Sequence, residues 1–297
     1  MRGAGKYIVA LLCLVAVLGA CRKKPEPQQT AAEEESVTGF YDLEAAKAAT
    51  ADRGRAMEMP ARMKGVSELV LKRSGYYVSY NKHRRVPNWV AWHLTADHTT
   101  GDHYRDGQEF AEDHDVPAPR ATLADYYGSG YDRGHLCPSG DNKWSSRAQR
   151  QSFLLTNVCP QMHDLNKGDW NDLEIQCRYW AKRMDGLYIV TGPVFYDGVK
   201  KTIGKNKVAV PDAFFKVLLS DSARPKCIGF IYPNKRGHKD MNEYLRPVDE
   251  IERITGIDFF PLLDDEVERV AEAAGYDRMM RDWNVAKAVS YYNSRSK

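Results

Sequence analysis

The sequence has little net charge of either sign and no repeated segments. Its 43 Lys and Arg residues are almost matched by 40 Asp and Glu, which leaves a formal net charge of +3. This balance excludes a strongly basic chain, so any affinity for polyanions must come from local clusters of charge. The absence of internal repeats argues against a repeat architecture. Regular alternation of strands and helices is also missing, and the irregular mixture favours the α+β class.

The sequence also lacks an apolar run of ~20 residues, the length that a transmembrane helix needs. Its longest apolar run, residues 7–18, follows a basic start and precedes small residues and a cysteine. A basic start, a short apolar segment and small residues at the cleavage point are typical of a secretory signal peptide. The pattern therefore predicts a signal peptide over residues 1–20.

The letters LGAC at residues 18–21 resemble the lipobox of bacterial lipoproteins. This resemblance implies cleavage before Cys21 and acylation of its sulfur; an ordinary cleaved signal with an incidental cysteine is the alternative. Residues 21–60 are polar, acidic and rich in alanine, which predicts a flexible tether. Residues 61–297 suffice for one substantial domain. The order of lipid, tether and domain predicts a lipid-anchored protein of the bacterial cell envelope, facing the periplasm or the outer-membrane surface.

The cysteines of the predicted domain lack the close spacing that is typical of a zinc site. No two of them form a C-x-x-C pair, which argues against zinc. An even number of cysteines in an exported domain favours disulfides, and three pairings are open. The residues concerned are Cys137, Cys159, Cys177 and Cys227.

The hydrophobic pattern predicts the main elements of the domain. Residues 75–95 predict two strands on either side of a Pro-Asn turn, and residues 97–130 predict a long surface loop. Apolar side chains recur at three- and four-residue spacing over residues 168–185, which predicts a helix with one buried face. Further strands are predicted at 131–136, 153–160, 187–195, 214–220 and 227–233, and further helices at 145–153, 247–254 and 264–274.

Four residues on successive predicted elements suit phosphodiester hydrolysis. His135 ends one predicted strand, and Asn157, Asn166 and Glu174 follow on the next strand, a loop-to-helix junction and a helix. A hairpin that leads into a helix can bring all four into one cleft. Imidazole, with an unperturbed pKa of ~6.5, can act as the base for water at neutral pH. Asn157 would either hold the imidazole in one tautomer or fix its backbone.

Asn166 and Glu174, the other two residues of this set, suit a metal ion. Mg²⁺ keeps most of its waters and takes few protein ligands, so the Asn166 oxygen and the Glu174 carboxylate would hold it weakly until a phosphate joins. The metal would stabilise charge on the phosphate and on the departing oxygen. The planar fork of Arg133 would contact phosphate.

Each of these residues also has an ordinary structural interpretation. Asp132 and Arg133 can pair with each other or cap the turn, and asparagines are common in turns. Glu174 and Arg178 are four residues apart on a predicted helix, which suits a surface ion pair. No one of these residues indicates a function by itself; the ordered spacing of the whole set does.

That spacing carries a resemblance to a known family. The motifs DRGH at 132–135, TNVCPQ at 156–161 and DLNKGDWNDLE at 164–174 resemble those of the DNA/RNA non-specific endonucleases of the ββα-metal (His-Me finger) fold, over roughly residues 75–260. The resemblance implies a central antiparallel sheet with flanking helices. It also implies Mg²⁺-dependent cleavage of DNA and RNA phosphodiester bonds, with Mn²⁺ as a possible substitute.

The resemblance further implies a role for each candidate residue. His135 would be the general base, Asn157 would support it, Asn166 would bind Mg²⁺ and Glu174 would hold metal-bound water. Substrate phosphates would contact Arg133, Arg178 and Arg105, of which Arg105 is the nearest candidate for an upstream arginine of the family. Cys137 and Cys159 depart from the family pattern beside these motifs, and a bridge between them is conceivable.

Two other functions stay open. The first is a non-catalytic module on the same fold that binds nucleic acid or a protein partner in the envelope. The second is a phosphodiesterase that acts on small nucleotides or lipid headgroups. Product formation separates the first from a nuclease, and substrate profiling separates the second.

Overall fold

The computed structural model describes residues 56–295. The predicted signal peptide, the lipidation site Cys21 and most of the predicted tether lie outside these residues. Met57 is buried, at 3% exposure, and packs into the core described below; the predicted division at residue 60 stays a prediction. No described helix combines the length and the apolar character that crossing a membrane requires.

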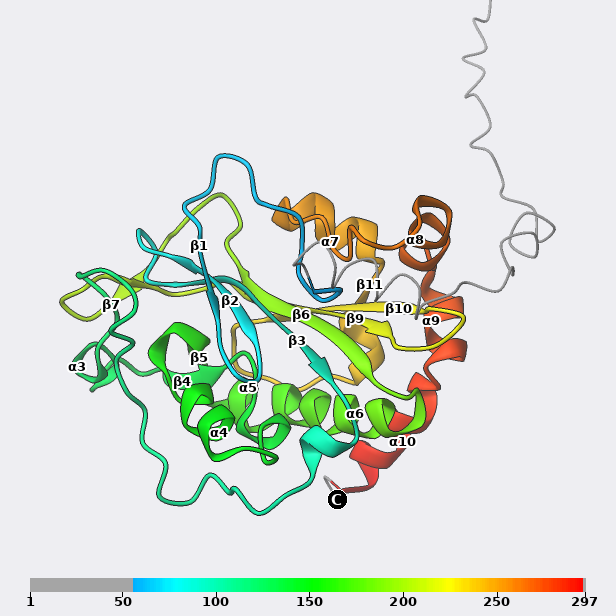
Figure 1. Ribbon diagram of the computed structural model, residues 1–297, viewed down its shortest axis with the longest axis horizontal. Coiled ribbons are helices and arrows are strands. Elements are labelled where there is room, and N and C mark those ends of the chain that lie inside the picture. The colour runs from blue at the N-terminus through cyan, green and yellow to red at the C-terminus, as the bar shows by residue number, and fades with distance from the viewer. Residues whose placement is uncertain (1–55, 296–297) are drawn as a thin grey trace, which may run out of the picture. The chain divides into compact units, whose positions relative to one another are not determined.

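The centre of the fold is a seven-stranded antiparallel sheet with the order β1-β2-β3-β6-β9-β10-β11 (Figure 1). Every residue of its middle strands β6 and β9 is buried, because both faces of the sheet are covered. The strands are β1 (Leu69–Lys72), β2 (Tyr77–Asn81), β3 (Val86–Leu94), β6 (Leu187–Val194), β9 (Ala213–Ser220), β10 (Cys227–Pro233) and β11 (Leu245–Arg246).

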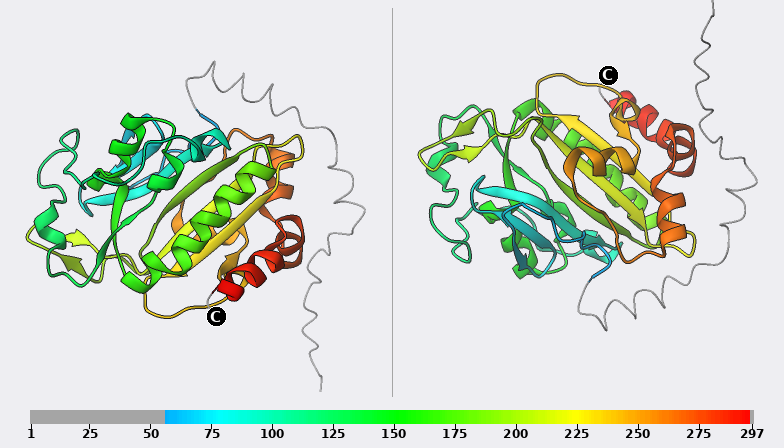
Figure 2. Two further views of the ribbon diagram at one scale, coloured as in Figure 1. Left: turned by 90° about the horizontal axis from the view of Figure 1, so that it is seen from below. Right: turned by 90° about the horizontal axis from the view of Figure 1, so that it is seen from above.

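Helices cover both faces of this sheet and enclose two separate cores (Figure 2). On one face lie α6 (Asp169–Arg183) and α10 (Val285–Arg295), and on the other lie α7 (Val248–Thr255) and α8 (Asp265–Glu272). Helix α6 buries Trp170, Leu173, Cys177, Trp180 and Ala181, as its apolar spacing predicts. The α+β class, with a central antiparallel sheet and flanking helices, is confirmed.

A smaller unit stands beside the sheet and forms the ββα arrangement. Strand β4 (Asp132–His135) pairs antiparallel with β5 (Val158–Gln161), and the chain then enters α5 (His163–Lys167) and α6. Gly134 permits this pairing, since a Cβ there would lie 2.2 Å from the Gln161 side chain. The other elements are α3 (Leu123–Tyr126), α4 (Ser146–Ser152), α9 (Tyr276–Asp282), β7 (Thr202–Ile203), β8 (Val208–Ala209) and four short 3-10 helices at Asp97–Thr99, Ser139–Asp141, Leu155–Asn157 and Met241–Tyr244.

Two predicted local structures were wrong. The Pro-Asn pair at 87–88 lies inside β3, and the chain turns at residues 82–85, where the Asn81 side chain accepts hydrogen bonds from the next backbone amides and Arg85 has φ 58. The register between β2 and β3 shifts at this point, because Asn88 is an extra residue of β3 between the pairs Tyr80–Pro87 and Ser79–Trp89. This irregularity lets the proline fit into the strand. The segment predicted as a strand from residue 153 includes a 3-10 turn, and the strand begins only at Val158.

The expectation of disulfides was also wrong for the described residues. Cys137, Cys159, Cys177 and Cys227 are all free and buried. Cys227 belongs to the core on one face of the sheet and the other three to the core on the opposite face, so the sheet separates it from them. Each thiol packs as a small apolar group, and no bridge joins Cys137 to Cys159.

Candidate active site

A cavity of about 1060 Å³ opens beside the ββα unit. Its wall includes all the residues predicted for catalysis, metal binding and phosphate contact except Asn157, together with residues of the long loop 97–130. The predicted residues in the wall are Arg105, Arg133, His135, Asn166, Glu174 and Arg178.

The His135 imidazole lies at the end of β4, between two aromatic rings. The ring centroids of Phe110 and Phe153 each lie 4.9 Å from it, and its Nε2 atom is buried without a hydrogen-bond partner among residues 56–295. Burial among these rings, and then the charges of Arg105, Lys167 and Arg133, lower the pKa of His135 to about 3. The imidazole is therefore neutral at physiological pH, which is the form that accepts a proton.

The Asn157 side chain acts on the backbone next to His135. Its Oδ1 accepts a hydrogen bond from the Cys137 amide at 2.9 Å, and its Nδ2 donates to the carbonyls of Cys137 and Ser152, both at 2.8 Å. Asn157 is fully buried, and these bonds use both of its N–H donors. Of the two predicted roles, the geometry supports fixing of the backbone; no bond to the imidazole is present.

The Asn166 amide is oriented by Asp132. Its Nδ2 donates to Asp132 Oδ2 at 2.8 Å, and the same carboxylate oxygen lies 2.9 Å from His163 Nδ1. The donor end of the amide is thereby held, and Oδ1 has no hydrogen-bond donor among the described residues. Asp132 was expected to pair with Arg133 or to cap the turn; its carboxylate instead contacts His163 and the candidate metal ligand Asn166.

Glu174 projects into the cavity from the second turn of α6. Gly168 separates this helix from the short α5 that carries Asn166, and a Cβ at Gly168 would lie 2.6 Å from the Asp164 carbonyl. Burial is the main reason why the pKa of Glu174 is raised to about 7. No hydrogen bond or ion pair to its carboxylate occurs within the described part of the chain.

These two side chains fit a magnesium ion. Asn166 offers an amide oxygen and Glu174 a carboxylate, and neither is used by another group of the described chain. Mg²⁺ prefers such oxygen ligands and retains several waters, so a site with few protein ligands is sufficient. A cation would also stabilise the ionised form of the half-buried Glu174.

The three predicted phosphate-binding arginines differ in their surroundings. Arg133 and Arg105 are exposed, with guanidinium carbons 4.8 Å from the Phe110 ring and 5.9 Å from the Phe153 ring. Arg178 instead donates to the buried carboxylate of Asp141 at 2.9 Å, and the alternative of a surface ion pair with Glu174 is not what the structure shows. The missing side chain at Gly140 makes room for the Arg178 guanidinium.

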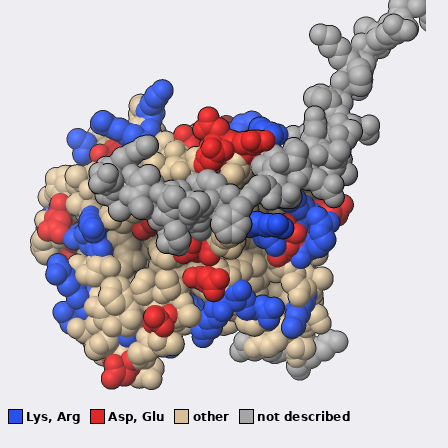
Figure 3. Space-filling model, turned by 45° about the vertical axis from the view of Figure 1, so that its right-hand side comes forward, with Lys and Arg blue, Asp and Glu red and all other residues tan. Residues whose placement is uncertain are grey.

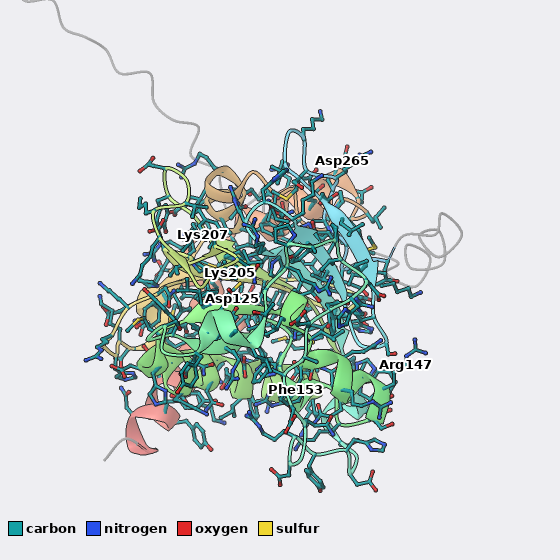
Figure 4. The ribbon with its side chains drawn as sticks, turned by 90° about the vertical axis from the view of Figure 1, so that its left-hand side faces the viewer. Asp125, Arg147, Phe153, Lys205, Lys207 and Asp265 are labelled. Atoms are coloured by element: carbon teal, nitrogen blue, oxygen red, sulfur yellow. The ribbon has the colours of Figure 1, made fainter. Side chains whose placement is uncertain are left out.

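Exposed aromatic and basic side chains both line the cavity. Tyr127 is 92% exposed and Tyr104 is 58% exposed, and Lys143 lies over the Tyr104 ring. Figure 4 views this side, with Phe153 inside the molecule and Arg147 of α4 pointing outward. Such a cavity wall offers stacking surfaces for bases and positive charge for phosphates.

Several residues of this site could not be found from the sequence. Phe110 lies in the irregular loop and Phe153 ends a helix, and neither belongs to a pattern that signals packing on a histidine. Asp141 also stands in a turn without periodicity. Asp132 was visible in its motif, but only the fold reveals that its partner is Asn166.

The fold and the site define a protein of the ββα-metal class. A family model described as DNA/RNA non-specific endonuclease matches residues 57–266. The chain therefore belongs to the DNA/RNA non-specific endonuclease family, as its motifs predict.

Known relatives and a solved structure agree with this assignment. The mitochondrial nuclease EXOG of Mus musculus is 37% identical over 208 residues, covering 64% of this chain and 56% of that protein. Mitochondrial endonuclease G of Bos taurus is 38% identical over 211 residues, covering 66% and 70%. Nuclease C1 of Cunninghamella echinulata var. echinulata is 38% identical over 216 residues, covering 67% and 86%.

One similar solved structure is that of an EndoG/EndoGI complex, described as showing the mechanism of EndoG inhibition. It has a TM-score of 0.63 and 30% identity, and it covers 67% of this chain and 89% of that chain. This chain spans a little over half the length of the EXOG proteins that it matches.

Proposed function

We propose that this protein is a Mg²⁺-dependent endonuclease that cleaves DNA and RNA without sequence preference. The observation that carries the proposal is that one cavity holds a neutral imidazole at His135, with its Nε2 atom buried, and the unused oxygens of Asn166 and Glu174. Family membership supports the same conclusion. A non-catalytic binding module is less well supported, since both the histidine and the two oxygen ligands are intact.

In the proposed mechanism His135 accepts a proton from the attacking water. Its neutral form is available because burial and nearby cations disfavour the imidazolium, and Asn157 keeps the backbone beyond β4 in place. When bound, Mg²⁺ would stabilise negative charge on the phosphate and on the departing oxygen. Asn166 and Glu174 would hold it, with Mn²⁺ as a possible substitute.

The exposed arginines would bind the phosphates of the substrate. Arg133 and Arg105 carry their charge at the wall of the cavity, and Arg178 would contribute from its pair with Asp141. Contacts to phosphate rather than to base edges carry little sequence information. Binding should therefore be sequence-tolerant and should weaken as salt is added.

The proposal predicts metal-dependent cleavage of both kinds of nucleic acid. Purified protein with Mg²⁺ should convert a closed circular plasmid to nicked and then linear forms, and should degrade single-stranded RNA. EDTA should stop both reactions, and excess Mg²⁺ should restore them. Gel electrophoresis of the products measures this. Tight binding of both substrates without any product in Mg²⁺ would instead identify a binding module.

A second prediction concerns pH at limiting metal. Glu174, with a pKa of about 7, is mostly protonated below that pH and ionised above it, whereas His135 stays neutral throughout this range. At low Mg²⁺ concentration kcat/KM should fall as pH drops below 7, and saturating Mg²⁺ should move this acid limb to lower pH. A limb fixed near pH 6.5 at every Mg²⁺ concentration would assign the titration to His135 instead.

We also propose that Cys21 anchors the protein to the lipid bilayer of a bacterial cell envelope. The support is the LGAC sequence after a short apolar run. Cells fed a labelled fatty acid should yield labelled protein in the membrane fraction, and Cys21→Ser should lose the label. Equal labelling of the variant would contradict lipidation at this residue.

A further inference from the structure

A second group of possible metal ligands lies on the other side of the sheet from His135. Asp249 and Glu252 lie on α7, and Glu272 is the last residue of α8. Each offers one carboxylate oxygen, and these three oxygens lie within 4.8 Å of one another. Both helices pack on the core of that face through residues such as Ile251 and Ala271, whereas the cavity belongs to the opposite face.

The views of the molecule agree with this separation. Figure 4 labels Asp265, at the start of α8, at the end of the view opposite to Phe153, which packs on the His135 ring. Figure 3 brings the side of α7 and α8 forward and shows acidic side chains gathered near its upper edge. The two groups of ligands are therefore distinct sites.

Glu272 is the informative member of this group. It is only 5% exposed, and its Oε1 atom is buried without a hydrogen-bond partner among residues 56–295. A buried carboxylate without a donor or a cation is strongly unfavourable in its charged form. Burial, followed by the charges of Glu252, Glu268, Asp249 and Asp258, raises the pKa of Glu272 to about 9.

The charged forms of the neighbouring Glu252 and Glu268 are disfavoured for the same reason. Burial is also the first cause of the raised pKa values of Glu252 and Glu268, each about 7, and nearby carboxylates add to both. The Oε1 atom of Glu252 accepts a hydrogen bond from the Phe259 amide at 2.8 Å, which fixes this side chain and leaves its other oxygen for a ligand. The cluster thus has prepositioned oxygens, and the neighbouring charges that shift the pKa values of Glu252, Glu268 and Glu272 are all those of carboxylates.

We propose that Asp249, Glu252 and Glu272 bind a hard divalent cation, with Ca²⁺ as the best fit. All three donors are carboxylate oxygens, which suit Ca²⁺ and not a soft metal. Ca²⁺ accepts six to eight oxygen ligands in flexible geometry, whereas Mg²⁺ demands a near-ideal octahedron at shorter distance. Two residues three apart on α7 and one at the end of α8 are a flexible set of this kind.

The bound ion would join α7 to the end of α8. It would stabilise the folded protein by mass action, since the unfolded chain does not hold these three carboxylates together. This site is independent of the proposed nuclease activity, so its effect should appear in stability and not in cleavage.

The test compares two Glu→Gln substitutions on the same helix. Glu272→Gln removes a proposed ligand, and Glu266→Gln changes an exposed residue of α8 outside the group. Calorimetric titration of the chelator-treated, full-length proteins with Ca²⁺ should show one binding event that Glu272→Gln weakens by about tenfold or more. Thermal unfolding should show a rise in Tm with Ca²⁺ for Glu266→Gln and for the unchanged protein, and little or none for Glu272→Gln.

A second ligand variant, a check of folding and a titration with Mg²⁺ complete the test of the proposed Ca²⁺ site. Glu252→Gln provides a second ligand variant in case Glu272→Gln folds poorly, and circular dichroism checks the fold of each. Parallel titrations with Mg²⁺ report the selectivity, since both variants leave Asn166 and Glu174 unchanged. Equal Ca²⁺ stoichiometry and an equal rise in Tm in all the proteins would overturn the proposal, and so would the absence of any Ca²⁺ effect on the unchanged protein.

Discussion

Replacing His135 by Ala is expected to lower kcat by about 10²- to 10⁴-fold, the usual contribution of a general base. The neutral imidazole lies at the wall of the cavity and is the proposed acceptor of the water proton. The proposed phosphate and metal ligands lie on other residues and remain in place. The variant should therefore bind DNA nearly as tightly as the unchanged protein. Plasmid cleavage in saturating Mg²⁺, together with a DNA-binding titration in Ca²⁺, measures the two effects separately.

His114→Ala is a suitable control for this substitution. His114 is exposed, contacts Arg120 and is not part of the cavity wall, so its removal should leave kcat within about twofold. Because the His135 ring packs between Phe110 and Phe153, its loss leaves a space, and Tm should be compared for both variants. Undiminished cleavage by well-folded His135→Ala would remove this residue from the mechanism.

The local part of the site could be predicted because its residues are close in sequence. His135, Asn157, Asn166 and Glu174 all lie within one hairpin and the helices that follow it. In such a unit the pairing of two short strands and the turn of a helix determine which side chains face each other. The motif spacing could therefore predict that His135, Asn166 and Glu174 lie at one cavity; their roles stay predictions.

The remaining features depend on contacts between distant segments, which no local pattern encodes. Phe110 reaches His135 from a loop without periodicity, and the Asp141–Arg178 pair spans 37 residues. The role of Asp132 required knowing that α5 folds back beside β4. In each case the side chain was visible in the sequence, but its partner was not.

Two of the wrong predictions, the Pro-Asn turn and the disulfides, have a common physical cause. Pro-Asn is a frequent turn pair, yet the Asn81 side chain makes a better turn just before it, and a bulge accommodates the proline. Even cysteine numbers favour disulfides in exported proteins, yet here the thiols fill apolar space in two cores on opposite faces of a sheet. In both cases contacts in the folded protein outweighed a statistical preference, for a turn at Pro-Asn and for disulfides in exported proteins.

Replacing Asn166 by Ala is the second change with a large expected effect. It removes the amide oxygen proposed to bind Mg²⁺, and metal stabilisation of charge is worth several kcal/mol. At about 1.4 kcal/mol per tenfold change in rate, cleavage at fixed low Mg²⁺ should fall by at least about 10²-fold. Measuring the rate across a Mg²⁺ titration should show a higher half-saturating concentration. An unchanged titration would exclude Asn166 as a ligand.

Asp132→Ala distinguishes the role of the proposed metal ligand Asn166 from the role of Asp132, which orients the Asn166 amide. The oxygen of Asn166 is still present in this variant, but the amide loses the acceptor that holds its Nδ2 at 2.8 Å. Loss of a residue that orients a metal ligand costs about 10- to 100-fold in affinity or activity, so high Mg²⁺ should restore this variant more fully than Asn166→Ala. Asn293→Ala is the matched control, because that amide also donates to a carboxylate, Asp240, but lies outside the cavity wall. If Asp132→Ala and Asn293→Ala behave alike, the contact between Asp132 and Asn166 has no part in metal binding.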